Sequence, residues 1–517
     1  MEDNKHPLLS RKDDEKKPSS LEKTCMKYEK EDSFTSSSSS DAESDIGPIN
    51  GVQDFLKEFL IESRKLWYLA GPSICTSVCQ YALGALTQIF AGHLGTIQLA
   101  AISVENSVFD GFGCGILMGM GSALETLCGQ AYGAKHIDML GIYMQRSWLI
   151  LNAAAHGIAL LFVFATPILQ LLGQTPAISM AAGKFALFMI PQQFAYALNV
   201  PLAKFLQAQS KLMEMAGIAA FALCLHVFLV WLLMMKLGWG LLGAAVILNA
   251  SWWFIALAQF LYVMAGGCGR AWSGFSWGAF TNLAEFVKLS VSSTVMFCLE
   301  VWYIMALTLA AGYLPNAEVS VAALSICMNI IGWSSTVGLG FNVAISVRVS
   351  NKLGSGQPRA AKFAVIVVGL TAFLFGLTSA LILLINRKEL PALFTDSIEA
   401  QQLVEDLTPF LGVSIIFTCL QCALSGVAIG AGWQNMVACI NAGCYFLLGV
   451  PLSILMGFKF DMGVKGIWYG MLVGLSLQAG SLLWMTCRTN WNKEAYAAEE
   501  RLKLWGGETK AQIDQVK

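Results

Sequence analysis

Long apolar runs separated by short polar connections dominate the chain from residue 67 onward. A helix needs about 20 mostly apolar residues to cross the hydrocarbon core of a bilayer. Twelve runs reach this length, and we therefore predict an all-α polytopic membrane protein. Its transmembrane helices are expected at residues 67–92, 97–123, 147–172, 180–206, 215–236, 241–264, 284–312, 318–345, 361–386, 408–431, 434–457 and 464–487.

The fourth run is the least apolar of the twelve. Pro191 and Pro201 interrupt it, together with the polar residues Gln192, Gln193 and Asn199. Such breaks are tolerated in a membrane helix where the backbone lines a cavity or packs on neighbouring helices.

The flanking segments are polar. Residues 1–50 are charged and rich in serine, a composition that predicts a disordered cytosolic tail. Apolar residues at helical spacing within 51–66 predict an interfacial helix that leads into the first span. Residues 488–517 mix aromatic and charged side chains and are expected to form a cytosolic C-terminal tail.

The two halves of the chain repeat at a shift of about 220 residues. Residues 90–94 (FAGHL) match 310–314 (AAGYL), and residues 99–103 (LAAIS) match 321–325 (VAALS). Six spans per half is an even number, so both halves enter the membrane from the same side and the repeat is parallel. We expect two pseudo-symmetric six-helix lobes with a cavity between them: an N-lobe at 67–264, an inter-lobe loop at 265–283 and a C-lobe at 284–487.

Glu300 lies in the middle of the seventh run. Twelve residues separate it from Lys288, which places the carboxyl about 18 Å into a core about 30 Å thick. Burial at that depth disfavours the charged form, so the side chain is expected to face a protein cavity and to exchange a proton. The alternative is a protonated glutamic acid that only joins two helices by a hydrogen bond. The repeat matches Glu300 with the neutral Gln80.

Other titratable residues also fall inside predicted spans. Glu105 and Asp110 in the second span compete with Glu300 for a proton-transfer role. His156 and His226 titrate near neutral pH in water. A single histidine in a span more often packs through hydrogen bonds, and we expect this of both.

Composition and motifs exclude several classes of function. The chain is 56% hydrophobic and 13% charged with a formal net charge of -1, and it carries no basic stripe suited to nucleic acid. No phosphate-binding loop of the GxxxxGK[ST] type occurs. Cys419 and Cys422 form a CxxC near Cys439 and Cys444, but no histidine accompanies them inside these apolar runs, so no metal site and no disulfide framework are expected. We expect a secondary transporter, not an enzyme, that needs no cofactor other than an ion gradient.

Basic residues in the short loops set the expected orientation, because loops rich in lysine and arginine stay in the cytosol. The bias places both termini in the cytosol. Nine basic residues fall on the cytosolic side, Lys135, Arg146, Lys211, Arg270, Lys288, Arg348, Lys352, Arg359 and Lys362, against six on the other side, Lys184, Lys236, Arg387, Lys388, Lys459 and Lys465.

Three loop motifs carry a family resemblance. They are residues 124–134 (LETLCGQAYGA), 348–358 (RVSNKLGSGQP) and 432–434 (GWQ). Together they resemble the plant branch of the multidrug and toxic compound extrusion (MATE) family, whose members are also called DETOXIFICATION proteins. The resemblance covers roughly residues 60–490. Within these motifs, we expect Arg348 to anchor the topology and Glu125 to accept hydrogen bonds from the connecting loop.

The resemblance implies a twelve-helix MATE fold, proton-coupled antiport of organic compounds, and Glu300 as the proton-coupling carboxyl. Several plant relatives have a second acid in the tenth span, where this chain has Thr418. A relay between two carboxylates is therefore in doubt, and Glu300 is expected to act with neutral partners. The candidates for the substrate cavity are Gln80, Gln192, Asn199, Tyr303, Thr418 and Gln421.

The expected activity is export of secondary metabolites and xenobiotics from the cytosol, by alternating access, into the vacuole or out of the cell. The expected partners are a small organic substrate, H⁺ and the lipid bilayer, with the protein acting as a monomer. The vacuolar membrane is the expected location and the plasma membrane the alternative. Two other activities stay open: an anion channel or transporter for chloride or organic acids in the vacuolar membrane, and flipping of lipid-linked precursors.

Overall fold

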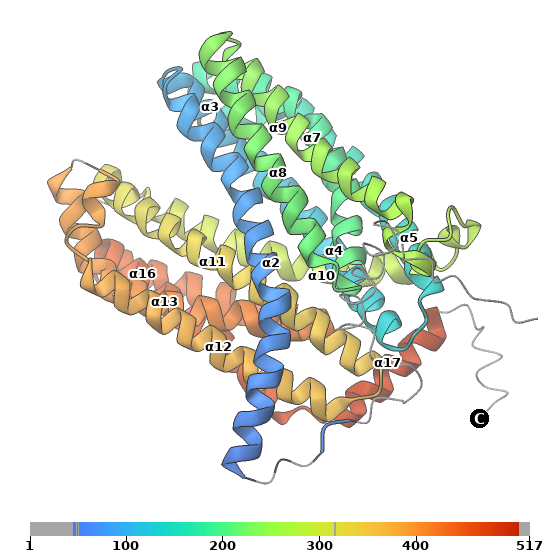
Figure 1. The fold of residues 1–517 in the computed structure, drawn as a ribbon. Helices are drawn as coiled ribbons and strands as arrows, with labels where there is room; N and C mark the ends of the chain where they lie inside the picture. The colour runs from blue at the N-terminus through green and yellow to red at the C-terminus, as the bar shows by residue number, and fades with distance from the viewer. Residues whose placement is uncertain (1–44, 48, 50, 315–316, 396, 506–517) are drawn as a thin grey trace, which may run out of the picture. The chain divides into compact units, whose positions relative to one another are not determined.

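A computed structural model describes residues 45–505, apart from residues 48, 50, 315, 316 and 396. The described residues form helices joined by short connections and contain no strand (Figure 1). The predicted tail at 1–50 lies almost entirely outside the described residues, as does the end of the chain after Trp505.

Helices of the N-lobe follow one another with short breaks. The second span is interrupted by a π-helical turn, η1, which carries both acidic residues of that span. The elements are α2 (Val52–Gly92), α3 (Thr96–Val104), η1 (Glu105–Asp110), α4 (Gly111–Gly133), α5 (Asp138–Val163), α6 (Ala165–Leu171), α7 (Pro176–Ala208), α8 (Leu212–Val230), η2 (Trp231–Lys236), α9 (Gly240–Tyr262) and η3 (Val263–Gly267).

Two 3₁₀ turns, η4 (Gly269–Ala271) and η5 (Trp277–Phe280), lie in the connection to the C-lobe. The eleventh span combines α-helical and π-helical stretches. The C-lobe elements are α10 (Leu283–Ala311), α11 (Ala317–Gly354), α12 (Pro358–Ile385), η6 (Pro391–Leu393), α13 (Ile398–Ala431), α14 (Gln434–Asn441), η7 (Ala442–Gly449), α15 (Val450–Ile454), η8 (Leu455–Lys459), α16 (Gly463–Arg488) and α17 (Trp491–Trp505).

Eleven helical segments of the described chain are long and apolar enough to cross a membrane. The predicted fourth span corresponds to α7, which has 33 residues and continues through both of its internal prolines. Its lower hydropathy comes from the polar residues that made this span the weakest one in the sequence. These polar residues are buried.

Some helices extend beyond the predicted limits. The interfacial segment and the first span form one continuous helix, α2, of 41 residues. The tenth span begins at Ile398, ten residues before the predicted start, because Ser397 caps the helix by accepting a hydrogen bond from the Ala400 N–H. Its first turns are polar, so hydropathy alone does not detect them.

Three hydrophobic clusters form the core. One contains only N-lobe residues, from Leu83 to Ile255, and one only C-lobe residues, from Tyr303 to Met471. The third mixes both lobes, with Leu124 and Leu127 of α4 in the same cluster as Val349 of α11. The lobes therefore share a core in one region and have separate cores elsewhere.

Glycines in α4 and α16 allow close packing, but not all in the same way. Gly470 packs against the Ser453 backbone of α15, inside the C-lobe. In α4, Gly111, Gly115 and Gly119 form a stripe at four-residue spacing, and of these three only Gly119 packs closely on another helix, against Thr294 of α10 in the other lobe. Gly111 and Gly115 line the cavity described below. The α4 stripe therefore serves the contact between the lobes and the cavity wall.

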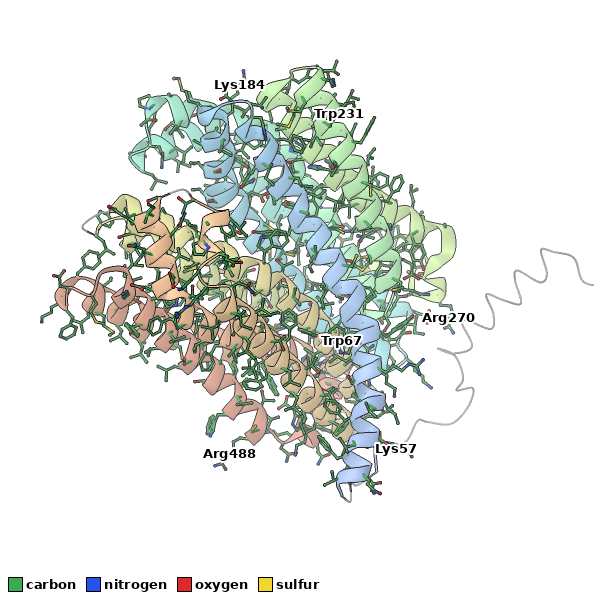
Figure 2. The ribbon with its side chains drawn as sticks, turned by 60° about the vertical axis from the view of Figure 1, so that its left-hand side comes forward. Lys57, Trp67, Lys184, Trp231, Arg270 and Arg488 are labelled. Carbon is green, nitrogen blue, oxygen red and sulfur yellow. The ribbon has the colours of Figure 1, made fainter. Side chains whose placement is uncertain are left out.

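Charged and aromatic side chains mark the outer surface (Figure 2). Trp67 and Trp231 are exposed on the outside of the helices. Lys184 lies at one end of the helices, whereas Lys57 and Arg488 lie towards the other. Such a surface, with exposed apolar side chains between charged ends, is typical of a protein that spans a bilayer.

Candidate functional site

A cavity of about 620 Å³ is lined by residues of both lobes. Most of its lining is apolar, and a few polar side chains point into it, which is the usual composition of a small-molecule site. Six of the polar residues singled out in the sequence line it together with Asp110: Gln80, Asn199, Glu300, Tyr303, Thr418 and Gln421.

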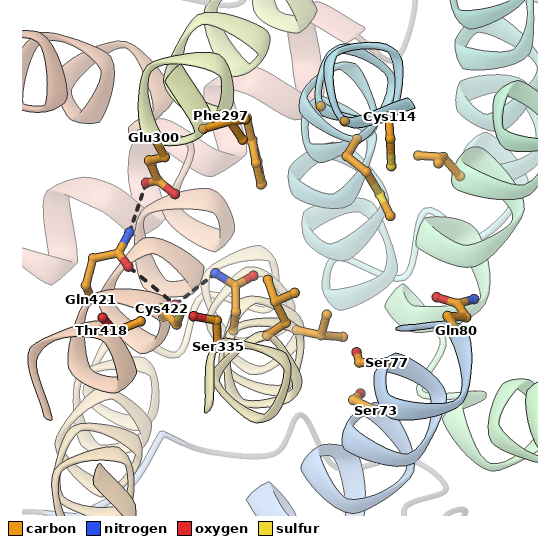
Figure 3. A pocket seen from close by; sticks show the side chains of 18 of the residues that line it. Ser73, Ser77, Gln80, Cys114, Phe297, Glu300, Ser335, Thr418, Gln421 and Cys422 are labelled. Carbon is orange, nitrogen blue, oxygen red and sulfur yellow. Dashed lines mark hydrogen bonds between the residues drawn. The ribbon is translucent and has the colours of Figure 1, made fainter. Parts of the chain in front are cut away.

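Glu300 enters the cavity from α10. Its Oε1 accepts hydrogen bonds from Gln421 Nε2 of α13 at 3.0 Å and from Asn441 Nδ2 of α14 at 3.2 Å. Figure 3 shows Glu300 and Gln421 on one side of the pocket and Gln80 and Cys114 on the other. Both hydrogen-bond donors are neutral amides. Glu300 is thus a cavity carboxyl whose described hydrogen-bond partners carry no charge.

Asn441 is a functional candidate that the sequence analysis missed. It is fully buried, and it also donates to the Met296 carbonyl of α10 at 3.2 Å. Gln478 of α16 in turn donates to Asn441 Oδ1 at 3.2 Å. The side-chain amides of Gln478 and Asn441 therefore form a hydrogen-bonded chain that ends at the Glu300 carboxyl. The available signal was an asparagine and a glutamine inside apolar runs, where buried polar groups need partners.

This arrangement balances two opposing effects on Glu300. Loss of water disfavours the carboxylate, whereas amide donors stabilise it. A group held in such a balance can gain or lose a proton when the access to water or the position of an amide changes. The site is therefore suited to proton exchange without a metal or a fixed positive charge.

Tyr303 and Thr418 also line the cavity, and both are buried. Tyr303 is 1% exposed, donates its hydroxyl to the Met471 carbonyl at 3.2 Å and stacks on Tyr445 at 4.4 Å between ring centroids. It packs α10 against α16 and η7. Thr418 lies on α13 about one turn before Gln421, on the same wall of the pocket (Figure 3).

On the N-lobe side, Gln80 of α2 and Asn199 of α7 line the cavity. Gln192 does not, and the prediction for this residue needs correction. It is buried inside the N-lobe, where its amide donates to Asp110 at 3.4 Å and to the Tyr196 hydroxyl. The helical rotation of α7, which the sequence does not specify, turns Gln192 behind Asp110.

Both histidines make hydrogen bonds within or between helices, away from the cavity. His226 is fully buried and its ring nitrogens lie 3.0 Å from Thr87 Oγ1 and 2.8 Å from Ser251 Oγ, which joins α8 to α2 and α9. His156 Nδ1 lies 2.8 Å from the Asn152 carbonyl in its own helix. Neither histidine lines the cavity.

The family-like motifs meet at the contact between the lobes. We call this region the motif end; it comprises the connections 134–137, 355–357 and 432–433 with the adjoining helix ends. Gln130 Nε2 donates to the Gly430 carbonyl at 3.1 Å, and Arg501 of α17 donates to Gln130 Oε1 at 2.7 Å. A Cβ at Gly133 would collide with the Asn351 backbone. The glycines of the motifs therefore allow the lobes to approach closely.

Two ion pairs lie near the motif end. Arg348 makes a two-pronged pair with Glu62 of α2, at 2.8 and 2.7 Å, and so joins the lobes. Glu125 pairs with Lys204 of α7 at 2.6 Å. The expectation that Glu125 accepts hydrogen bonds from the connecting loop is wrong, because its partner is a lysine from another helix.

Comparison with known proteins agrees with this architecture. The sequence profile of the MatE family matches residues 72–232 and 293–455, one stretch in each lobe. Protein DETOXIFICATION 30 of Arabidopsis thaliana is 58% identical over 91% of this chain and 94% of its own length. Protein DETOXIFICATION 31 of the same plant is 55% identical over 98% of this chain and 97% of its own length.

Among solved structures, the crystal structure of the eukaryotic MATE transporter AtDTX14 superposes with a TM-score of 0.83 at 35% identity. The match covers 86% of this chain and 99% of that one. These relatives confirm the predicted twelve-helix fold, and they are transporters, not enzymes. The matching profile in both lobes, the close plant relatives and the shared fold establish that this chain is a member of the MATE family of membrane transporters.

Proposed function

We propose that this transporter exchanges protons for organic compounds and that Glu300 is its proton-coupling residue. The observation that carries the proposal is the position of Glu300, which faces a cavity between the lobes with neutral amide donors from α13 and α14. An ionisable group inside a membrane protein that faces such a cavity usually marks an ion or substrate pathway.

Protonation of Glu300 weakens both of its hydrogen bonds, because bonds to a charged group are worth about 1 kcal/mol more than bonds between neutral groups. The two amides thus account for about 2 kcal/mol. A difference of two pH units across the membrane supplies about 2.7 kcal/mol per proton. The free energy that one proton supplies is thus similar to the free energy lost from the two hydrogen bonds. One proton is therefore enough to change which packing of α10 is preferred.

Asn441 connects the proton to the movement of the helix. Its amide donates to Glu300 and to the Met296 carbonyl one turn earlier in α10. When Glu300 loses its charge, the first of these bonds weakens and α10 is held less firmly against α14. Alternating access then follows as a shift between two packings of α10, driven by the proton.

The size and lining of the cavity favour an organic compound as the transported substrate. Its volume of about 620 Å³ lies within the usual range for sites that hold drug-sized molecules. Apolar side chains such as Phe297, Ile304 and Met328 line it, and these suit aromatic or aliphatic groups. We propose that the cargo moves from the cytosol into the vacuole, or out of the cell if the protein resides in the plasma membrane. In this arrangement both termini are cytosolic and the monomer is the working unit.

The test uses the full-length protein in liposomes with an imposed pH gradient. Uptake of two aromatic probes, ethidium and quercetin, is measured for wild type and for Glu300→Gln. We expect the variant to reconstitute normally but to lose gradient-driven uptake. Glu285→Gln is the matched control, because Glu285 lies exposed in the first turn of the same helix.

Uptake by Glu300→Gln that still follows the pH gradient would refute the role of Glu300. Currents in planar bilayers that reverse at the chloride potential and need no organic solute would identify an anion channel instead. Translocation of a fluorescent lipid in the same liposomes would identify a flippase.

A further inference from the structure

The N-lobe contains a second acidic site, which the proposed function does not use. Glu105 and Asp110 begin and end the π-helical turn η1. Asp110 lines the cavity and accepts hydrogen bonds from Gln193 Nε2 at 3.1 Å and Gln192 Nε2 at 3.4 Å. Glu105 is 0% exposed, and neither of its oxygens has a hydrogen-bond partner among the described residues.

The π-helical turn brings these two carboxyls together. In an α-helix, residues five apart point about 140° away from each other. Here the Gly111 N–H donates to the Asn106 carbonyl, five residues earlier, so the turn is wider and the difference in direction is smaller. The carboxyls of Glu105 and Asp110 interact electrostatically. Such π-helical turns are rare and are frequently found at functional sites.

The cluster has more hydrogen-bond acceptors than donors. Besides the oxygens of Glu105, the side-chain carbonyl oxygens of Gln192 and Gln193 are buried without a partner in the described part of the chain. The amides of these glutamines already donate to Asp110, and the Gln192 amide also donates to the Tyr196 hydroxyl. A proton on either carboxyl would supply a donor that the cluster lacks.

Among the described residues, no positive charge is directed at the pair. The elements packed against η1 are α3, α4 and α7, and the titratable groups they direct at the pair are Cys114 and Tyr196. Lys204, which lines the same cavity, is already paired with Glu125 at 2.6 Å. Two neighbouring carboxylates repel each other, and burial of Glu105 strengthens this effect, so the pair is not expected to be ionised at both positions.

We propose that Glu105 and Asp110 share an exchangeable proton and form a second protonation site of the transporter, in the N-lobe. The proton passes between cavity water and Asp110, while Glu105 stays sealed behind it. This inference goes beyond the proposed function, which places a single proton on Glu300 in the other lobe. Phe112 and Trp302 stack across the lobes with centroids 6.2 Å apart, so α4, which directly follows η1, is in contact with α10, which carries Glu300.

The experiment follows protonated carboxyls directly and needs no substrate. The full-length protein in liposomes is taken through a pH jump above the range in which exposed carboxyls titrate, about pH 4, while infrared spectroscopy records the carbonyl stretch of protonated carboxylic acids. In Glu300→Gln, we expect a pH-dependent band to remain. Adding Asp110→Asn should abolish its pH dependence, because Glu105 then stays protonated. Adding Glu105→Gln instead should change the pH at which the band reaches half of its full intensity change.

The control is Glu285→Gln, which removes an exposed carboxyl and should leave the difference band unchanged. The inference is overturned if Glu300→Gln shows no pH-dependent band, or if Asp110→Asn leaves the band as it was. Where Asp110→Asn does not fold, Gln193→Leu removes one donor to Asp110 and should shift the midpoint of the band. Because the readout is made without Glu300, it can fail while the proposed function of Glu300 holds, and the reverse.

Discussion

The ion pair between Glu62 and Arg348 offers a quantitative test of how the lobes are held together. It joins α2 to α11, with Arg348 Nε 2.8 Å from Glu62 Oε1 and Nη2 2.7 Å from Oε2. The Glu62 side chain is 5% exposed and the Arg348 side chain is 15% exposed. Glu62→Gln removes the negative charge and leaves the guanidinium buried between the lobes.

Removing one partner of a buried pair costs about 3–5 kcal/mol, because the remaining charge loses its compensation. An exposed pair gives the comparison. Lys465 and Asp406 are 43% and 58% exposed and 2.8 Å apart, so Asp406→Asn should cost less than about 1 kcal/mol. Glu62→Gln should therefore lower the Tm by several degrees, and Asp406→Asn by much less.

The measurement is a double-mutant cycle read by thermal unfolding of the purified protein. Its members are wild type, Glu62→Gln, Arg348→Met and the double variant. We expect a coupling energy of at least about 2 kcal/mol, with the double variant more stable than Glu62→Gln alone. Additive single effects, or an equal loss in Asp406→Asn, would refute the reasoning that this pair holds the lobes together.

Two further predictions concern packing and the site. Gly133→Ala forces a Cβ into the backbone of α11, so it should destabilise the protein by about 1–3 kcal/mol in thermal unfolding, whereas Gly157→Ala, which meets open space, should not. Asn441→Leu removes an amide donor from the Glu300 carboxyl, and a lost bond to a charged group of about 1.5–3 kcal/mol should slow gradient-driven ethidium uptake about 10- to 100-fold. An unchanged uptake rate in a well-folded Asn441→Leu would show that this amide has no part in coupling.

Hydropathy was enough to predict an all-α membrane protein and the positions of most of its spans. Each of these depends on which residues leave water, and that is a local property of the chain. The internal repeat then indicated a cavity between lobes, and the loop motifs indicated the family. Even the weak fourth span was present in the sequence, as polar residues in an otherwise apolar run.

Only the tertiary structure decided which side chains meet. Gln421 and Asn441 are 121 and 141 residues from Glu300, and their hydrogen bonds depend on how three helices are rotated against one another. The rotation of α7 likewise places Gln192 behind Asp110, and the π-helical turn that begins at Glu105 changes the relative direction of the two acids. Hydropathy determines that a helix is buried, but the face it presents at each level depends on the packing of all its neighbours.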